Sequence, residues 1–203
     1  PDEALPLLLN WAKENQSSLE TEENFARLKG RILWLKEKAP NTAFDLSDDE
    51  WNQCFYQSAE ETLYGQTSAR EIDLTEAFTR AVEGLKPGFM KQLNAEAPSH
   101  FQAPTGNRFA IDYTPGQNPS VEVRLQELFG LGIHPSIARG LVPLTLKLLG
   151  PNYRPVQVTS DLVGFWKGSY FEVKKELKAR YPKHSWPDRP DTAAPEAKGH
   201  RRR

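Results

Sequence analysis

Residues 154–190 read RPVQVTSDLVGFWKGSYFEVKKELKARYPKHSWPDRP, and this stretch decides how the second half of the chain folds. Its first residues alternate as a short β-strand, and residue types that cap helices follow at positions 159–161. Apolar side chains then recur at intervals of three and four: Leu162, Trp166, Tyr170, Val173 and Leu177. That spacing predicts one long amphipathic helix that ends before Pro182 and has a single apolar face to bury.

The residues upstream of this stretch, from Pro98 onward, predict a small antiparallel sheet. Proline and glycine become frequent there, and apolar residues alternate with polar ones. The predicted strands lie within residues 100–103, 109–113, 121–129, 142–149 and 156–158. A Pro-Thr-Gly turn at 104–106 joins the first two as a hairpin, and 121–129 predicts a strand that leads into one helical turn. We expect four or five strands.

The first half of the chain has helical periodicity instead. Apolar residues recur every three or four positions between Thr21 and Lys38, which predicts one buried stripe. Ser47 followed by Glu50 forms the pattern of a capping box and opens a second helix that Gly65 stops. A third helix is expected from Asp73 to Leu85 and a short fourth one over residues 89–97. Together these helices predict a small bundle.

We therefore expect an α+β fold: an N-terminal helical half, then a small antiparallel β-sheet covered by a C-terminal amphipathic helix. The expected divisions are a helical subdomain at 1–97, the sheet with its terminal helix at 98–181, and a flexible basic tail at 182–203. The end of that tail, PDRPDTAAPEAKGHRRR, is rich in proline, alanine and charge, and offers little apolar surface to bury.

Several classes of function lack their sequence signatures in this chain. There is no phosphate-binding G-x-x-x-x-G-K-[ST] loop, no dinucleotide fingerprint and no nucleophile elbow, so we expect no catalysis from these residues alone. The histidines have no partners at metal-ligand spacing, which predicts neither a metal nor a cofactor.

The single cysteine, Cys54, forms no internal disulfide, and no apolar run approaches the roughly 20 residues of a membrane helix. We expect a cytoplasmic protein. Because the chain opens on Pro1 and its only methionine is Met90, we expect it to be part of a longer polypeptide.

Charge is distributed unevenly along the chain. Residues 1–98 carry 10 Lys or Arg against 18 Asp or Glu, a net charge of −8, whereas residues 99–203 carry 16 against 9, a net charge of +7. The second half could therefore attract polyanions. Two solvated faces, or mutual attraction between the halves, would explain the same asymmetry.

The candidate functional residues are basic side chains in and after the terminal helix: Lys167, Lys174, Lys175, Lys178, Arg180 and Lys183. They are interleaved with aromatic residues, and rings that stack on unpaired bases beside cations that neutralise phosphates are the chemistry of single-strand binding. The helical spacing of Trp166 and Tyr170 equally suits core residues, with the lysines on an ordinary solvated face. Both interpretations remain open from the sequence.

The last part of the chain closely resembles the C-terminal region of the bacterial DEAH-type ATP-dependent helicases of the HrpB family. The resemblance lies in PTGNRFAIDY, SVEVRLQELFG, VPLTLKLLGP, RPVQVTSDLVGFWKGSYFEVKKELKARYPKH and SWPD, and spans about residues 85–190. It implies a parent enzyme that couples ATP hydrolysis to the remodelling of RNA or another nucleic acid through tandem RecA-like motor domains. ATP and magnesium would bind in those motor domains, which this chain does not contain.

The resemblance leaves the role of this region open between two interpretations. In the first, it is an accessory domain that binds single-stranded or structured RNA for the motor domains of the same polypeptide. In the second, it is an interaction or scaffold module that docks the motor domains or recruits another protein. Binding requires the candidate cations to converge with exposed rings on one face, whereas dispersed lysines over buried rings favour the scaffold.

Overall fold

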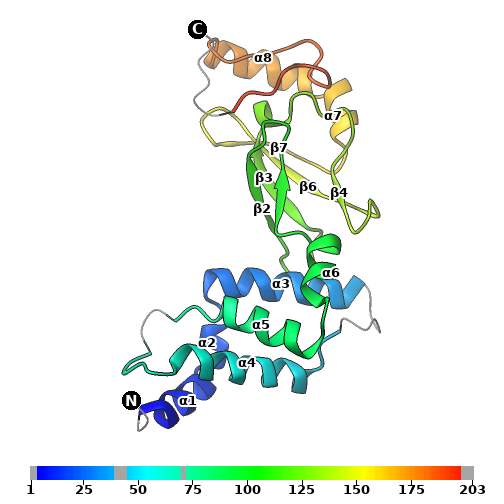
Figure 1. Ribbon diagram of the computed structural model, residues 1–203. Coiled ribbons are helices and arrows are strands. Elements are labelled where there is room, and N and C mark those ends of the chain that lie inside the picture. Colours follow the sequence, from blue (N-terminus) through cyan, green and yellow to red (C-terminus); the bar gives the residue numbers. More distant parts are fainter. Residues whose placement is uncertain (1–3, 39–44, 70–71, 198–203) are drawn as a thin grey trace. The chain divides into compact units, whose positions relative to one another are not determined.

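The computed structural model describes residues 4–38, 45–69 and 72–197, and the chain separates into two compact units between Ala97 and Pro98 (Figure 1). The first unit is helical, and the second contains the strands and the last two helices. Among the described residues, none of the helices is both long enough and apolar enough to cross a membrane.

The helical unit packs around a cluster of aromatic rings. Its helices are α1 (Ala4–Glu14), α2 (Gln16–Leu19), α3 (Glu23–Lys38), α4 (Asp48–Leu63), α5 (Thr75–Leu85) and α6 (Phe89–Glu96). Phe25 of α3 lies at the centre, with its ring 6.0 Å from Trp51, 6.3 Å from Phe55 and 5.0 Å from Phe78, all in edge-on geometry. These rings come from three helices, so burying them joins α3, α4 and α5.

The start of α4 follows the predicted capping chemistry. The hydroxyl of Ser47 accepts a hydrogen bond from the Glu50 backbone N–H at 3.2 Å, and the Glu50 carboxylate accepts one from the Ser47 N–H at 2.8 Å. The predicted capping box is thus confirmed, and so are helices over the predicted ranges. Helices α1 and α2 lie outside the predicted ranges.

The second unit is built on a five-stranded sheet in the order β1-β2-β3-β6-β7. Its strands are β1 (His100–Gln102), β2 (Arg108–Asp112), β3 (Ser120–Arg124), β6 (Thr145–Leu149) and β7 (Pro155–Thr159). The predicted hairpin, and the strand leading into the 3₁₀ turn η1 (Leu125–Leu128), are confirmed. The side chains of Val123 on β3 and Leu148 on β6, the two central strands, are fully buried.

The α+β class is confirmed, but the prediction of a purely antiparallel sheet was wrong. Strands β3 and β6 pair in parallel, with Val121 opposite Leu146 and Val123 opposite Leu148. Between these strands the chain makes η1 and a separate small hairpin, β4 (Ser136–Ile137) with β5 (Val142–Pro143). This long connection allows β6 to run in the same direction as β3. A tight hairpin turn would make the two strands antiparallel.

The predicted single terminal helix is interrupted. Helix α7 (Leu162–Lys167) ends at Gly168, whose φ of −118° and ψ of −103° leave the helical region, and α8 (Tyr170–Arg180) starts again after it. At the start of α7, Asp161 accepts a hydrogen bond from the Gly164 N–H at 2.9 Å. A Cβ on Gly164 would stand 2.2 Å from the Asp161 carboxylate, so this glycine makes room for the cap.

The expectation of a flexible tail from residue 182 differs from the structure over residues 182–197, which we call the strap. The strap folds back beside α8 (Figure 1) and is hydrogen-bonded to the body of the unit: the Gly130 N–H donates to the Pro190 carbonyl oxygen at 2.8 Å, and the Glu196 N–H donates to that of Gln126 at 2.9 Å. Main-chain groups of any composition can form such bonds, so composition alone gives no sign of them. The cluster of basic residues at 198–203 lies outside the described residues.

A candidate nucleic-acid interface on α8

The large rings of the terminal region are core residues. Trp166, Tyr170 and Trp186 are 4%, 0% and 8% exposed. The Trp166 indole N–H donates to the Leu131 carbonyl oxygen at 3.0 Å, and the Tyr170 hydroxyl donates to the Pro187 carbonyl oxygen at 2.8 Å. The Trp186 indole N–H donates to the Tyr181 carbonyl oxygen at 2.9 Å. The polar atoms of all three rings are thereby satisfied inside the fold, so none of the three is available to stack on a base.

One aromatic ring of α8 does face solvent. Phe171 is 48% exposed and follows the buried Tyr170 directly, so it points away from the apolar stripe. Lys175 and Lys178 stand four and seven residues after it and share its side of the helix. Among the described residues neither lysine forms an ion pair, and both are exposed. We call Phe171, Lys175 and Lys178 the α8 face.

The other predicted cations are in different situations. Lys174 forms an ion pair with Asp188 of the strap, and its side chain is only 13% exposed. Arg180 pairs with Glu176 at 3.2 Å on a different side of α8, since it lies five residues after Lys175. Lys167 ends α7 and Lys183 follows α8, and both are exposed. The structure thus brings Lys174, Lys175 and Lys178 together on α8, with Arg180 on another side of that helix and Lys167 and Lys183 outside it.

Phe171 was missed by the sequence reasoning, although the signal was present. The apolar stripe of α8 runs through Tyr170 and Leu177, and a ring one position off that stripe has no core to enter. Its spacing of four and seven to the two lysines was the pattern to look for.

A second polar cluster surrounds the buried carboxylate of Glu127 and serves the fold. The Glu127 carboxylate accepts hydrogen bonds from Asn107 at 3.0 Å and from the Thr105 hydroxyl, and pairs with Arg124 at 3.0 Å. Donors already surround the carboxylate, so it offers no open position to a substrate. Within the described part of the chain, no group of three or more His, Cys, Asp or Glu side chains is placed to hold a metal ion.

The helical unit carries an open groove between α1 and α4. It has a volume of about 520 Å³ and is lined by Pro6, Leu9, Asn10, Lys13, Tyr56, Gln57 and Glu60. Its lining mixes apolar and amide groups with one lysine and one glutamate, which form no ion pair with each other. The groove therefore suits a contact surface better than a reaction.

Comparison with known proteins places the chain among helicase C-terminal regions. The family described as ATP-dependent helicase C-terminal, HrpB_C, matches residues 58–190. The chain is 40% identical over 194 residues to the ATP-dependent RNA helicase HrpB of Escherichia coli strain K12, covering 93% of this chain and 22% of that protein.

Solved structures agree with this relationship. A crystal structure of the E. coli DExH-box NTPase HrpB matches 96% of this chain with a TM-score of 0.78 and 38% identity, and one of the E. coli DEAH/RHA helicase HrpB matches 91% with 0.67 and 36%. The chain covers 24% of each solved chain, so it spans about a quarter of the length of these relatives. On the family match and these likenesses together, the chain belongs to the HrpB ATP-dependent helicase C-terminal family.

Proposed function

We propose that this chain is a non-catalytic accessory region of an ATP-dependent helicase, and that it holds nucleic acid, in the first place RNA, through the α8 face. The observation that carries the proposal is the solvent-facing Phe171 on the same side of α8 as two exposed lysines that form no ion pair with any described residue. ATP and magnesium would act in the motor domains of the longer polypeptide, which are the first partners of this region. The cytoplasmic location remains a prediction.

The α8 face can bind a single strand without reading its sequence. The ammonium groups of Lys175 and Lys178 would neutralise adjacent phosphates, and the exposed ring of Phe171 would stack on an unpaired base. Because each phosphate contact on a single strand contributes a slope of about −0.7 to the dependence of log K on log salt, two contacts give about −1.4. We therefore expect weak binding that falls about sevenfold for a fourfold rise in salt and does not depend on base identity.

The test is the affinity of the 203-residue chain for a labelled single-stranded RNA across a salt series. Lys175→Glu with Lys178→Glu should abolish binding at low salt, and Phe171→Ala should weaken it about tenfold, because base–ring stacking contributes about 1–3 kcal/mol. Lys13→Glu with Lys91→Glu is the matched control, since it makes the same charge change at exposed positions of the helical unit. Equal losses in the two double variants would mean that only net charge matters, and would sink the proposal.

The alternative function is a protein-interaction or scaffold module that docks the motor domains or recruits a partner protein. It is favoured by the apolar surface of α1, where Leu7 is 74% exposed beside the groove between α1 and α4. An exposed leucine next to such a groove suits a protein surface better than a polyanion. Absence of RNA binding at low salt, together with a folded chain, would leave this alternative as the working account.

A further inference from the structure

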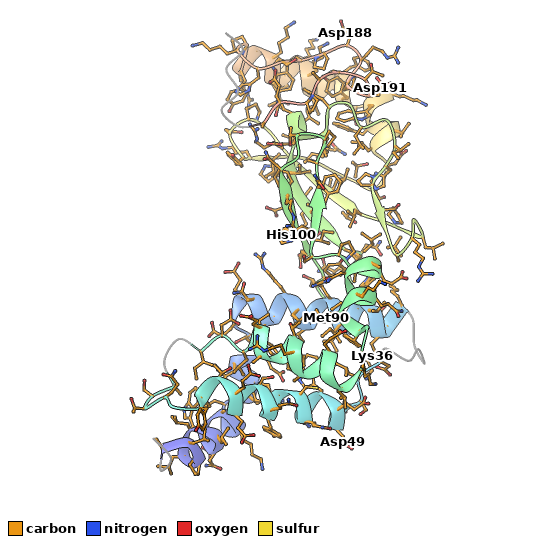
Figure 2. The ribbon with its side chains drawn as sticks, in the orientation of Figure 1. Lys36, Asp49, Met90, His100, Asp188 and Asp191 are labelled. Carbon is orange, nitrogen blue, oxygen red and sulfur yellow. The ribbon has the colours of Figure 1, made fainter. Side chains whose placement is uncertain are left out.

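The strap holds one carboxylate directly against a cation of α8. Asp188 lies between Pro187, whose carbonyl oxygen accepts from the Tyr170 hydroxyl, and Pro190, whose carbonyl oxygen accepts from the Gly130 N–H. These two bonds fix the backbone on both sides of Asp188, which Figure 2 labels beside α8. The fold therefore sets where the backbone of Asp188 lies beside Lys174, while its side chain keeps the freedom to turn away.

The two partners of this ion pair differ strongly in exposure. The side chain of Asp188 is 93% exposed, whereas that of Lys174 is 13% exposed. Water therefore reaches the carboxylate freely, and a competing anion can approach from the same side. The lysine is already ordered against the protein, so a phosphate that replaced Asp188 would find a positioned cation and would not have to order a flexible one.

The pKa values of two strap carboxylates show that lysines of α7 and α8 act on them. The hydrogen bond and charge of Lys174 lower the pKa of Asp188 below its ordinary value, and Lys178 of the α8 face adds to this effect. Three residues further along the strap, Asp191 has its pKa lowered first by Arg189 and to a smaller extent by Lys167. Carboxylates of the strap thus act on Lys167, Lys174 and Lys178, half of the six cations predicted from the sequence.

We propose that Asp188 is an internal competitor for phosphate: it occupies on Lys174 the position that a nucleic-acid phosphate would take, and so limits binding at the α8 face. This inference rests on the proposed function. A bound strand exchanges the carboxylate for a phosphate, and Lys174 then becomes a third basic contact beside Lys175 and Lys178. No covalent bond is made or broken in this exchange; one hydrogen-bonded ion pair replaces another, and Asp188 turns to solvent.

The decisive variant is Asp188→Asn, which keeps the size of the side chain and removes its charge. In the 203-residue chain, it should bind labelled single-stranded RNA about three- to tenfold more tightly at low salt. The slope of log K against log salt should steepen by about 0.7, the contribution of one more phosphate contact. Glu122→Gln is the matched control, because it removes one negative charge from the same unit at a residue whose ion-pair partner is Lys147 of the sheet.

A second comparison separates the specific pair from the general charge. Lys174→Ala should erase the gain, so that Asp188→Asn with Lys174→Ala binds no more tightly than Lys174→Ala alone. An unchanged melting temperature shows that the strap remains packed in each variant. If Asp188→Asn gains no more than Glu122→Gln, or gains equally without Lys174, the inference is overturned.

These outcomes remain distinct from failure of the proposed function. If the unaltered chain binds RNA and the double variant Lys175→Glu with Lys178→Glu does not, the proposed function of the α8 face is supported whatever the result for Asp188→Asn. If neither the unaltered chain nor Asp188→Asn binds at low salt, both proposals fall. Binding by Asp188→Asn alone would support both, with the internal carboxylate strong enough to mask the site.

Discussion

The indole Nε1 of Trp166 lies 3.0 Å from the main-chain carbonyl oxygen of Leu131 and donates a hydrogen bond to it. This bond joins α7 to the segment after η1, and the Trp166 ring packs 6.1 Å from Phe129 and 5.3 Å from Tyr170. An aromatic residue between basic neighbours is thus one of the central packing residues of the second unit. For this ring, the buried position favours a role in the core over stacking on a base.

Trp166→Ala should therefore destabilise the second unit by about 3–5 kcal/mol, because it empties a large buried volume and leaves the Leu131 carbonyl without its donor. Urea unfolding monitored by circular dichroism measures this loss. Phe171→Ala is the control. The Phe171 ring is half exposed, so the free energy of unfolding of this variant should differ from that of the unaltered chain by less than about 1 kcal/mol. Similar values for the two variants would contradict the assignment of Trp166 to the core.

The two members of the buried pair of Arg124 and Glu127 should depend on each other for their contribution to stability. Both side chains are enclosed, at 6% and 3% exposure, so a single replacement leaves an uncompensated charge inside the fold. Arg124→Met and Glu127→Gln should each destabilise the chain by about 3–5 kcal/mol. The double variant should lose about 1–3 kcal/mol less than the sum of the two.

Chemical denaturation of the two single variants and the double variant measures this coupling. Strict additivity would show that the two groups do not depend on each other, and would remove the ion pair as the reason for the cost. Thr105 and Asn107, which also donate to Glu127, remain in place in every variant and so do not bias the comparison.

Stability should fall at alkaline pH through Tyr170. Burial first, and the charge of Asp188 second, raise the pKa of Tyr170 above its ordinary value of about 10. The unfolded chain then loses this proton at a lower pH than the folded chain does. The stabilisation is complete below about pH 10 and is lost as pH rises from there towards the folded pKa.

Free energies of unfolding measured between pH 8 and about pH 12 test this effect in Tyr170→Phe. The variant should start about 1 kcal/mol lower, because the bond to the Pro187 carbonyl oxygen is gone, and should then decline less steeply. Tyr153→Phe, at a residue that is 49% exposed, should keep the steep decline. A slope in Tyr170→Phe as steep as in the unaltered chain would assign the alkaline loss to other groups.

Local features of the fold were predictable from sequence, and non-local ones were not. The capping box at Ser47 and Glu50 depends on residues three apart, so the pattern specifies it directly. The parallel pairing of Val121 with Leu146 depends on the path of the intervening chain, and alternation is the same for either strand direction.

The same distinction applies to the candidate interface. The sequence predicted which residues are cationic, but not which of them are already paired. Lys174 meets Asp188 only because the strap folds back across α8, fourteen residues further along the chain. The strap has no apolar periodicity to reveal it, and it is held by main-chain carbonyls such as that of Pro190, to which composition gives no clue.

The packing of the strap gives a last prediction at Gly130. This glycine has a φ of +87°, and a Cβ added to it would stand 3.0 Å from the carbonyl oxygen of Ala193 in the strap. Gly130→Ala therefore combines an unfavourable left-handed backbone conformation with a steric clash between the new methyl group and the Ala193 carbonyl oxygen of the strap. Gly106 has nearly the same φ, +88°, with nothing within 4 Å of the added Cβ, so Gly106→Ala isolates the backbone effect, about 1–2 kcal/mol.

Gly130→Ala should exceed the cost of Gly106→Ala by about 1 kcal/mol or more, because the strap has to move before the methyl group fits. Urea unfolding measures the difference in free energy, and limited proteolysis measures whether cleavage within residues 182–197 becomes faster. Release of the strap would also uncover Trp186, whose indole N–H donates to the Tyr181 carbonyl oxygen at 2.9 Å, so its fluorescence should shift towards that of an exposed indole. Equal costs and equal proteolysis in the two variants would mean that, in solution, the carbonyl oxygen of Ala193 does not lie close enough to residue 130 to meet the added methyl group. The strap would then be too loose to hold Asp188 against Lys174.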